Sequence, residues 1–253
     1  MNYVTIKGIE SDTSYVQSEW PVFCLKEQMD NAYDFYTENY PNSPKSDRMI
    51  AVRVWADKDD DEQIKCGLIH IRVRNLNVNN IAVFTNLQAT FDFNQWYSSK
   101  RDQHKGTCGS LGDFLKRSLG MGYASMTQII DNVGGGGDSF EDNNNKQWEH
   151  PLILRFNGKE YRVFIRVDEF SEDPIRSDIK GPFECLIPEG CIESEVTLPR
   201  RVIPNEWGEY LNNLYLKLFE YYKRYKIAKS RIHFEFDGKG LCYDKISKVG
   251  DLE

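Results

Sequence analysis

The sequence has no long hydrophobic run and no hydrophobic leader. No segment approaches the roughly eighteen consecutive apolar residues that a membrane-spanning helix requires. The first residues, Met1 to Lys7, lack the apolar core of a signal peptide. We therefore expect a cytoplasmic protein with no membrane partner.

Paired cysteines and an excess of positive charge are also absent. The six cysteines are scattered and form no C-x-x-C pair, so the sequence indicates neither a zinc site nor a disulfide framework. The net charge of −7 argues against a protein that coats DNA with its whole surface, although it allows local basic patches.

The composition is that of a folded globular protein. A chain of 253 residues with 40% hydrophobic and 13% aromatic residues can bury a substantial core. We expect one large domain over residues 20–240, an N-terminal arm over residues 1–19 and a C-terminal tail over residues 241–253.

The segment from Leu25 to Phe35 is the most informative part of the chain. Read as a helix, it places Glu27, Asn31 and Asp34 on one face. The other side carries apolar residues that can pack against a sheet, namely Met29, Ala32, Tyr33 and Tyr36. A glutamate can take a proton from water, and an asparagine oxygen can hold a magnesium ion that bridges phosphates. The alternative interpretation is that Glu27, Asn31 and Asp34 form an ordinary solvated face of an amphipathic helix and have no catalytic role.

The rest of the chain alternates between strand and helix patterns. Strands are predicted at residues 49–56, 67–75, 124–131, 152–156, 161–167, 191–198 and 231–236, and helices after residue 106 and at 206–225. Within the second strand, hydrophobic residues alternate with His70, Arg72 and Arg74, and Asn75 stands at its end. Residues 76–108 lack periodicity and are predicted to form a long loop or lid. The pattern predicts an α+β two-layer sandwich.

This order of elements resembles the GHKL ATPases, the superfamily of gyrase, heat-shock chaperone, histidine kinase and MutL ATPases. The resemblance implies a Bergerat-type ATP-binding fold, in which helices lie on one face of a mixed sheet. On the first-helix motif of that family, Glu27 matches the catalytic general base and Asn31 the magnesium-binding asparagine, and Asp30 and Asp34 match the acidic positions around them.

The family's second motif, Asp-x-Gly-x-Gly at a strand end, is only partly present. Its aspartate accepts a hydrogen bond from the adenine amino group. Here the equivalent segment runs Asn75-Leu-Asn-Val-Asn79, so an amide replaces the carboxylate and both glycines are missing. The carbonyl oxygen of Asn75 is still able to accept that hydrogen bond.

The third family motif binds phosphates. The segment Gly109-Ser110-Leu111-Gly112-Asp-Phe-Leu-Lys116 is similar to the G-x-x-G-x-G-x-K loop, with Phe114 in place of the third glycine. The backbone N–H groups of such a loop hold anions at a helix N-terminus. Upstream, Ser98-Ser99-Lys100 resembles the Ser-Ser-Lys lid element of the topoisomerase VI B subunit. The resemblance implies nucleotide contacts from Ser99, Lys100, Gly106, Gly109, Ser110, Leu111 and Gly112, and a catalytic charge from Lys116. Packing alone would also explain a glycine turn before a helix.

Two segments of the C-terminal half resemble the topoisomerase VI B subunit in particular. Residues 189–196 resemble its H-G-T-x-[IV]-E segment, with Cys191 at the threonine position, and residues 210–238 resemble its last helix and closing strand. The resemblance implies an enzyme that binds ATP with Mg²⁺ and hydrolyses the ATP. It also implies a nucleotide-dependent homodimer that acts on or near DNA with a DNA-cleaving or other protein subunit. The alternatives are a nucleotide-responsive protein-interaction module without appreciable hydrolysis and a kinase of the histidine-kinase branch.

Overall fold

The computed structural model describes residues 19–40, 42–44, 47–56, 68–78, 146–147, 150–167, 175–199, 207–225, 233–237 and 239–241. Neither described helix has the length and apolar content of a membrane span.

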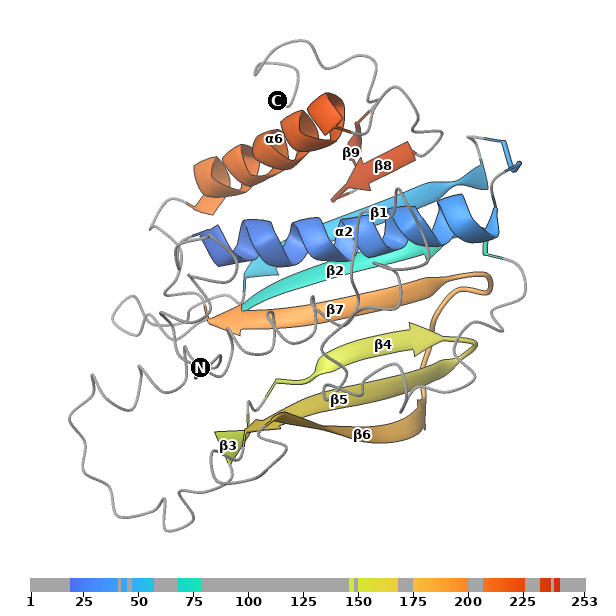
Figure 1. Ribbon diagram of the computed structural model, residues 1–253, viewed down its shortest axis with the longest axis vertical. Helices are drawn as coiled ribbons and strands as arrows, with labels where there is room; N and C mark the ends of the chain where they lie inside the picture. The colour runs from blue at the N-terminus through green and yellow to red at the C-terminus, as the bar shows by residue number, and fades with distance from the viewer. Residues whose placement is uncertain are drawn as a thin grey trace, which may run out of the picture.

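A mixed β-sheet forms the centre of the described chain (Figure 1). Its strands are Met49–Ala56 (β1), Leu68–Leu76 (β2), Lys146–Gln147 (β3), Leu152–Phe156 (β4), Lys159–Val167 (β5), Ile175–Glu184 (β6), Ile192–Pro199 (β7), His233–Phe236 (β8) and Lys239–Leu241 (β9). The order across the sheet is β3-β5-β4-β7-β2-β1-β8-β9, and β6 pairs with β5. Among the described pairs, β1 and β8 run parallel and all the others are antiparallel.

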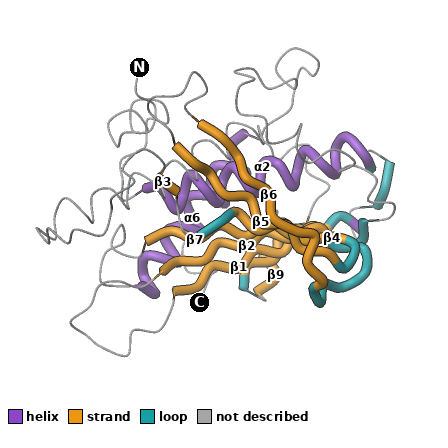
Figure 2. Tube along the Cα trace, turned by 90° about the horizontal axis from the view of Figure 1, so that it is seen from below, coloured by secondary structure: helices purple, strands orange, loops and turns teal. Residues whose placement is uncertain are grey.

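Both described helices, Trp20–Asn39 (α2) and Trp207–Tyr225 (α6), pack on the same face of this sheet. The strand register runs from Ser194 through β2 and β1 to Phe236, so these two side chains share a face. Ser194 donates a hydrogen bond to Gln28 of α2, and the ring of Phe236 lies 4.7 Å from that of Tyr215 of α6. Figure 2 shows α2 along one side of the sheet. The predicted α+β sandwich with helices on one face is confirmed.

The core lies between the helices and this face. Alternate residues are buried from Ile50 to Val54 in β1 and from Ile69 to Asn75 in β2. From α2, the Tyr36 side chain reaches the sheet, and its hydroxyl hydrogen bonds to the backbone carbonyls of Met49, at 2.8 Å, and Leu76. Met29 is also fully buried, so the predicted apolar side of this helix does pack on the sheet. Burial of Met29 and Tyr36 alone stabilises the fold by several kcal/mol, at roughly 2 kcal/mol for each large side chain.

One long strand was not expected. The sequence of β6 contains the Gly181-Pro182 pair, which is a turn signal and lacks one backbone donor. It is tolerated here because β6 pairs with β5 alone among the described strands. The chain enters β5 through Asn157 and Gly158, whose positive φ angles of 50° and 70° are those of a two-residue hairpin turn. The helix predicted after residue 106 and the strand at 124–131 lie outside the described residues.

Candidate functional site

The glutamate and asparagine predicted to act on a nucleotide lie in the middle of α2, one helical turn apart. Glu27 is 9% exposed, and Asp30 and Asp34 are fully buried. The alternative of a solvated polar face is therefore wrong, because three acidic side chains of this segment are withdrawn from water. Burying a carboxylate is unfavourable unless it is paired, so these residues need partners.

Lys26, which the sequence did not single out, supplies one such partner. Its Nζ atom lies 2.6 Å from Oε1 of Glu27 and 3.1 Å from Oδ2 of Asp30. The lysine side chain is itself only 17% exposed, which strengthens both ion pairs relative to pairs in water. The i,i+4 spacing of Lys26 and Asp30 was the available signal in the sequence. Lys26 thus holds the Glu27 carboxylate in a defined position.

Asn31 differs from these acidic residues because its side-chain polar atoms form no hydrogen bond within the described residues. Both Oδ1 and Nδ2 of its amide are buried, and neither has a hydrogen-bond partner in the described part of the chain. A buried amide left without partners is destabilising by about 1–3 kcal/mol, so such groups are uncommon unless a ligand completes them. The Oδ1 atom is a hard neutral oxygen, a donor type that Mg²⁺ accepts. Asn31 fits the metal-binding role predicted for it.

Asn75 lies where predicted, near the end of β2, but its amide serves the fold. It is 6% exposed, and its Nδ2 atom donates a 2.9 Å hydrogen bond to the backbone oxygen of Ala32 in α2. The nitrogen thus fastens the helix to the sheet. Adenine recognition by the oxygen atom of Asn75 stays a prediction.

Gln28 is a second residue that the sequence reading missed. Its Oε1 atom accepts a 2.8 Å hydrogen bond from Ser194 of β7, and the side chain is almost fully buried. It therefore connects the Glu27–Asn31 turn to the central strands. Gln28 is itself polar, so the hydrophobic pattern gave no sign that it lies on the sheet-facing side of the helix.

The phosphate-binding residues predicted from the glycine loop and lid lie outside the described residues. These are Ser99, Lys100, Gly106, Gly109, Ser110, Leu111, Gly112 and Lys116. The structure brings together Glu27, Asn31 and Asp34 on α2, and it places Asn75 against the same helix.

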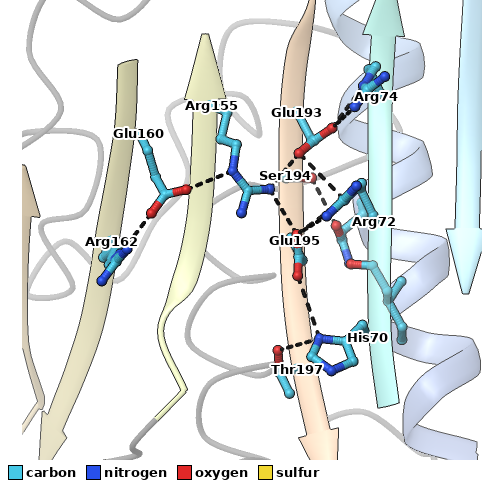
Figure 3. A network of polar contacts seen from close by, with 12 residues as sticks. His70, Arg72, Arg74, Arg155, Glu160, Arg162, Glu193, Ser194, Glu195 and Thr197 are labelled. Carbon is cyan, nitrogen blue, oxygen red and sulfur yellow. Dashed lines mark hydrogen bonds and ion pairs between the residues drawn. The ribbon is translucent and has the colours of Figure 1, made fainter. Parts of the chain in front are cut away.

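A second polar constellation occupies the sheet face opposite the helices (Figure 3). Glu193 and Glu195 of β7 lie between arginines of β2 and β4. Arg72 donates to Glu195 from Nε and Nη2, at 3.1 and 2.8 Å, and Arg74 pairs with Glu193. Arg155 contacts both carboxylates through Nη1, at 2.5 and 2.8 Å. The network ties three neighbouring strands together.

Titration of this network follows from its geometry. Burial raises the pKa of Glu195, but hydrogen bonds from His70, Arg155 and Arg72 outweigh burial and lower this pKa to about 2. Burial also raises the pKa of Glu160, but hydrogen bonds from Arg155 and Arg162 lower it by more, so this pKa lies below the ordinary value. These carboxylates are charged throughout the physiological range.

We expect stability to fall in acid because of Glu195. The pKa of this carboxyl is lower in the folded state, about 2, than the ordinary 4.5, so its contribution is present above pH 4.5 and is lost as pH falls towards 2. The loss in free energy of unfolding is on the order of 3 kcal/mol. Urea unfolding at a series of acidic pH values measures it. The Glu195→Gln variant should be less stable at neutral pH and show a shallower acid dependence; an unchanged dependence would contradict the assignment.

Comparison with known proteins finds a likeness in fold only. The sequence matches no protein-family model and no curated protein. Among solved structures, it is similar to the ATPase region of Saccharomyces cerevisiae topoisomerase II bound to ICRF-187 (dexrazoxane), with a TM-score of 0.42, 13% identity and 87% of this chain covered. A second structure of that ATPase region gives a TM-score of 0.40, 14% identity and 86% coverage. The chain spans 48% of either structure's length. Neither is a topoisomerase VI B subunit, so that finer resemblance stays a prediction.

Proposed function

We propose that this chain is a magnesium-dependent ATP-binding and ATP-hydrolysing module of the GHKL type. The observation that carries the proposal is the buried amide of Asn31, which has no hydrogen-bond partner among the described residues and lies one helical turn from the buried carboxylate of Glu27. A metal-binding role for Asn31 explains why its amide forms no hydrogen bond within the described residues. A role in proton transfer explains why the Glu27 carboxylate is withdrawn from bulk water. Calorimetric titration with a non-hydrolysable ATP analogue, with and without Mg²⁺, tests the binding half of the proposal.

In the proposed mechanism, Glu27 accepts a proton from the water that attacks the terminal phosphate. Lys26 is the positioning residue, since its ion pair with Glu27 restricts the rotamers of that carboxylate, and its ion pair with Asp30 fixes the lysine itself. Asn31 Oδ1 would hold the magnesium ion, which when bound supplies positive charge against the phosphates. Asp34 is the remaining acidic residue on this side of the helix.

The rest of the proposed nucleotide site follows from the family resemblance. Asn75 would accept a hydrogen bond from adenine, and the Gly109–Gly112 loop with Lys116 would neutralise phosphate charge. Lys100 and the residues around it would close over the nucleotide as a lid. Nucleotide-dependent homodimerisation, and action on or near DNA with a further protein subunit, belong to the same proposal.

We expect the Asn31→Ala variant to lose magnesium-dependent affinity. Wild-type chain should bind the ATP analogue more tightly with Mg²⁺ than without it, and the variant should bind about equally in both conditions. The loss should be on the order of tenfold or more, because a metal ligand is removed. Asn213→Ala is the matched control, since Asn213 is exposed on α6. If Asn31→Ala kept the full magnesium response, the assignment of Asn31 would be wrong.

A nucleotide-responsive interaction module without hydrolysis is the second candidate function. The engaged nitrogen of Asn75 favours it, because the family's adenine-binding carboxylate is replaced here by an amide with a structural task. Binding of the ATP analogue without any turnover above that of a Glu27 variant would support this candidate over the ATPase.

A further inference from the structure

On the sheet face opposite the helices, one cross-strand row of residues carries cations at both of its ends. Strand register places Arg53 of β1 opposite Arg72 of β2, then continues through Glu195 of β7 and Ile153 of β4. On the far side it reaches Arg162 of β5 and Lys180 of β6. With strands about 4.8 Å apart, these five steps span about 24 Å. We call Arg53, Arg72, Arg162 and Lys180 the cationic line.

The cations of this line are accessible, whereas the carboxylate within it is not. Arg53 and Lys180 are exposed, and the side chains of Arg162 and Arg72 are 47% and 26% exposed. Glu195 is 7% exposed and already accepts hydrogen bonds from Arg72 and Arg155. Along the cationic line, the carboxylate of Glu195 therefore lies beneath the guanidinium of Arg72, and the cations are the exposed groups. On a chain of net charge −7, such a face is set apart from the rest of the molecule.

Folding alone does not account for the arrangement. Arg53 and Arg72 are like charges placed directly opposite each other on neighbouring strands, which is unfavourable for sheet pairing. Arg53 has no carboxylate partner among the described residues. Both guanidinium groups lie over the ring of Trp55, at 5.2 and 4.9 Å from its centroid, and the Arg72 guanidinium is also hydrogen-bonded to Glu195.

The far end of the line combines charge with an exposed aromatic ring. The guanidinium of Arg162 lies 4.9 Å from the ring centroid of Phe183, which is 42% exposed. A phosphate chain needs cations spaced along a track, and unpaired bases stack on exposed aromatic rings. An acidic polypeptide would use the cations but has no need of the ring. In the described residues, this face presents flat strands and no helix that could enter a duplex groove.

We propose that the cationic line binds single-stranded nucleic acid, with phosphates on its arginines and lysine and a base stacked on Phe183. The site is on the face opposite the proposed ATP site, so it does not rest on that function. Because the contacts are to phosphates and to one aromatic ring, binding should be weakly dependent on sequence and strongly dependent on salt.

Fluorescence anisotropy with a labelled oligothymidine of about 16 nucleotides tests the proposal. The double variant Arg53→Gln/Lys180→Gln keeps the Glu160 and Glu195 ion pairs intact. It should bind on the order of tenfold more weakly and reduce the slope of log affinity against log salt by roughly 1.4, for two lost phosphate contacts. Lys217→Gln, an exposed lysine of α6, is the matched control and should bind as wild type does. Phe183→Ala should weaken binding roughly fivefold or more, with the salt slope unchanged.

Several results would overturn the proposal. One is unchanged affinity in the double variant, and another is an equal loss in Lys217→Gln. Tighter binding to a duplex of the same length would show that unpaired bases are not recognised. Full competition by polyglutamate together with no effect of Phe183→Ala would assign the face to an acidic polypeptide. Circular dichroism of each variant confirms that it is folded. Binding is measured without ATP, so the Glu27→Gln variant should bind the oligothymidine normally even if the ATPase proposal fails.

Discussion

The Glu27→Gln variant is expected to bind an ATP analogue as the wild-type chain does and to lose turnover almost completely. General-base catalysis contributes about a hundredfold to ten-thousandfold in rate, so steady-state hydrolysis should fall by at least about a hundredfold. The amide has nearly the shape of the carboxylate but cannot accept the proton. Because Glu27 acts on water and not on the nucleotide, binding affinity should change little.

A contaminating ATPase is the main hazard of this measurement. Glu220→Gln, which removes an exposed carboxylate from α6, should be purified in parallel and should keep wild-type turnover. If the two variants hydrolysed ATP at the same rate, Glu27 would not be the base. Lys26→Met provides a further check, since loss of the ion pair at 2.6 Å should lower the turnover number more than it changes nucleotide affinity.

Within the ion-pair network, we expect the Arg155→Met substitution to cause the largest decrease in the free energy of unfolding. The Arg155 guanidinium is the shared partner of three carboxylates, Glu160, Glu193 and Glu195, all of which are nearly buried. Removing one partner of a buried ion pair is destabilising by about 3–5 kcal/mol, because the charge left behind has been withdrawn from water. Urea unfolding at neutral pH measures the change.

Arg162→Met is the matched control for this variant. Arg162 also contacts Glu160, at 2.7 Å, but its side chain is 47% exposed, so the expected loss is under about 1 kcal/mol. Similar losses in the two variants would show that burial does not determine the contribution of these pairs. In acid, the difference between Arg155→Met and wild type should narrow as the carboxylates become protonated.

Local pattern was sufficient for the elements with a clear period. The spacing of Met29 and Tyr36 along α2, and the alternation of β2, depend on neighbours in sequence, and both elements form where predicted. By contrast, β6 owes its existence to pairing with β5, which overrides the Gly181-Pro182 signal. Its formation depends on a neighbouring strand that a local pattern does not reveal.

In the candidate site, too, the sequence predicts the features that depend on neighbouring residues and misses those that depend on distant ones. The shared face of Glu27 and Asn31 follows from helical spacing, and the structure adds that their side-chain polar atoms are withdrawn from water. The sequence pattern could not predict the partners of the β2 arginines, because Glu195 is 123 residues away from Arg72 in the chain. Only the strand order, which places β7 next to β2, brings them together. The bond from Gln28 to Ser194 spans 166 residues and was hidden for the same reason.

The parallel pairing of β1 with β8 bears on how the chain reaches its native state. Residues 49–52 pair with residues 233–236, so this part of the sheet cannot be completed until residues 233–236 have left the ribosome. Contacts of such long sequence separation slow folding, because the chain loses the entropy of closing a large loop before the stabilising hydrogen bonds form. Until then, the backbone donors and acceptors on one side of β1 are open to strands of other molecules. Nascent chains of this protein should therefore depend on chaperones that shield strand edges, and fragments ending before residue 233 should aggregate.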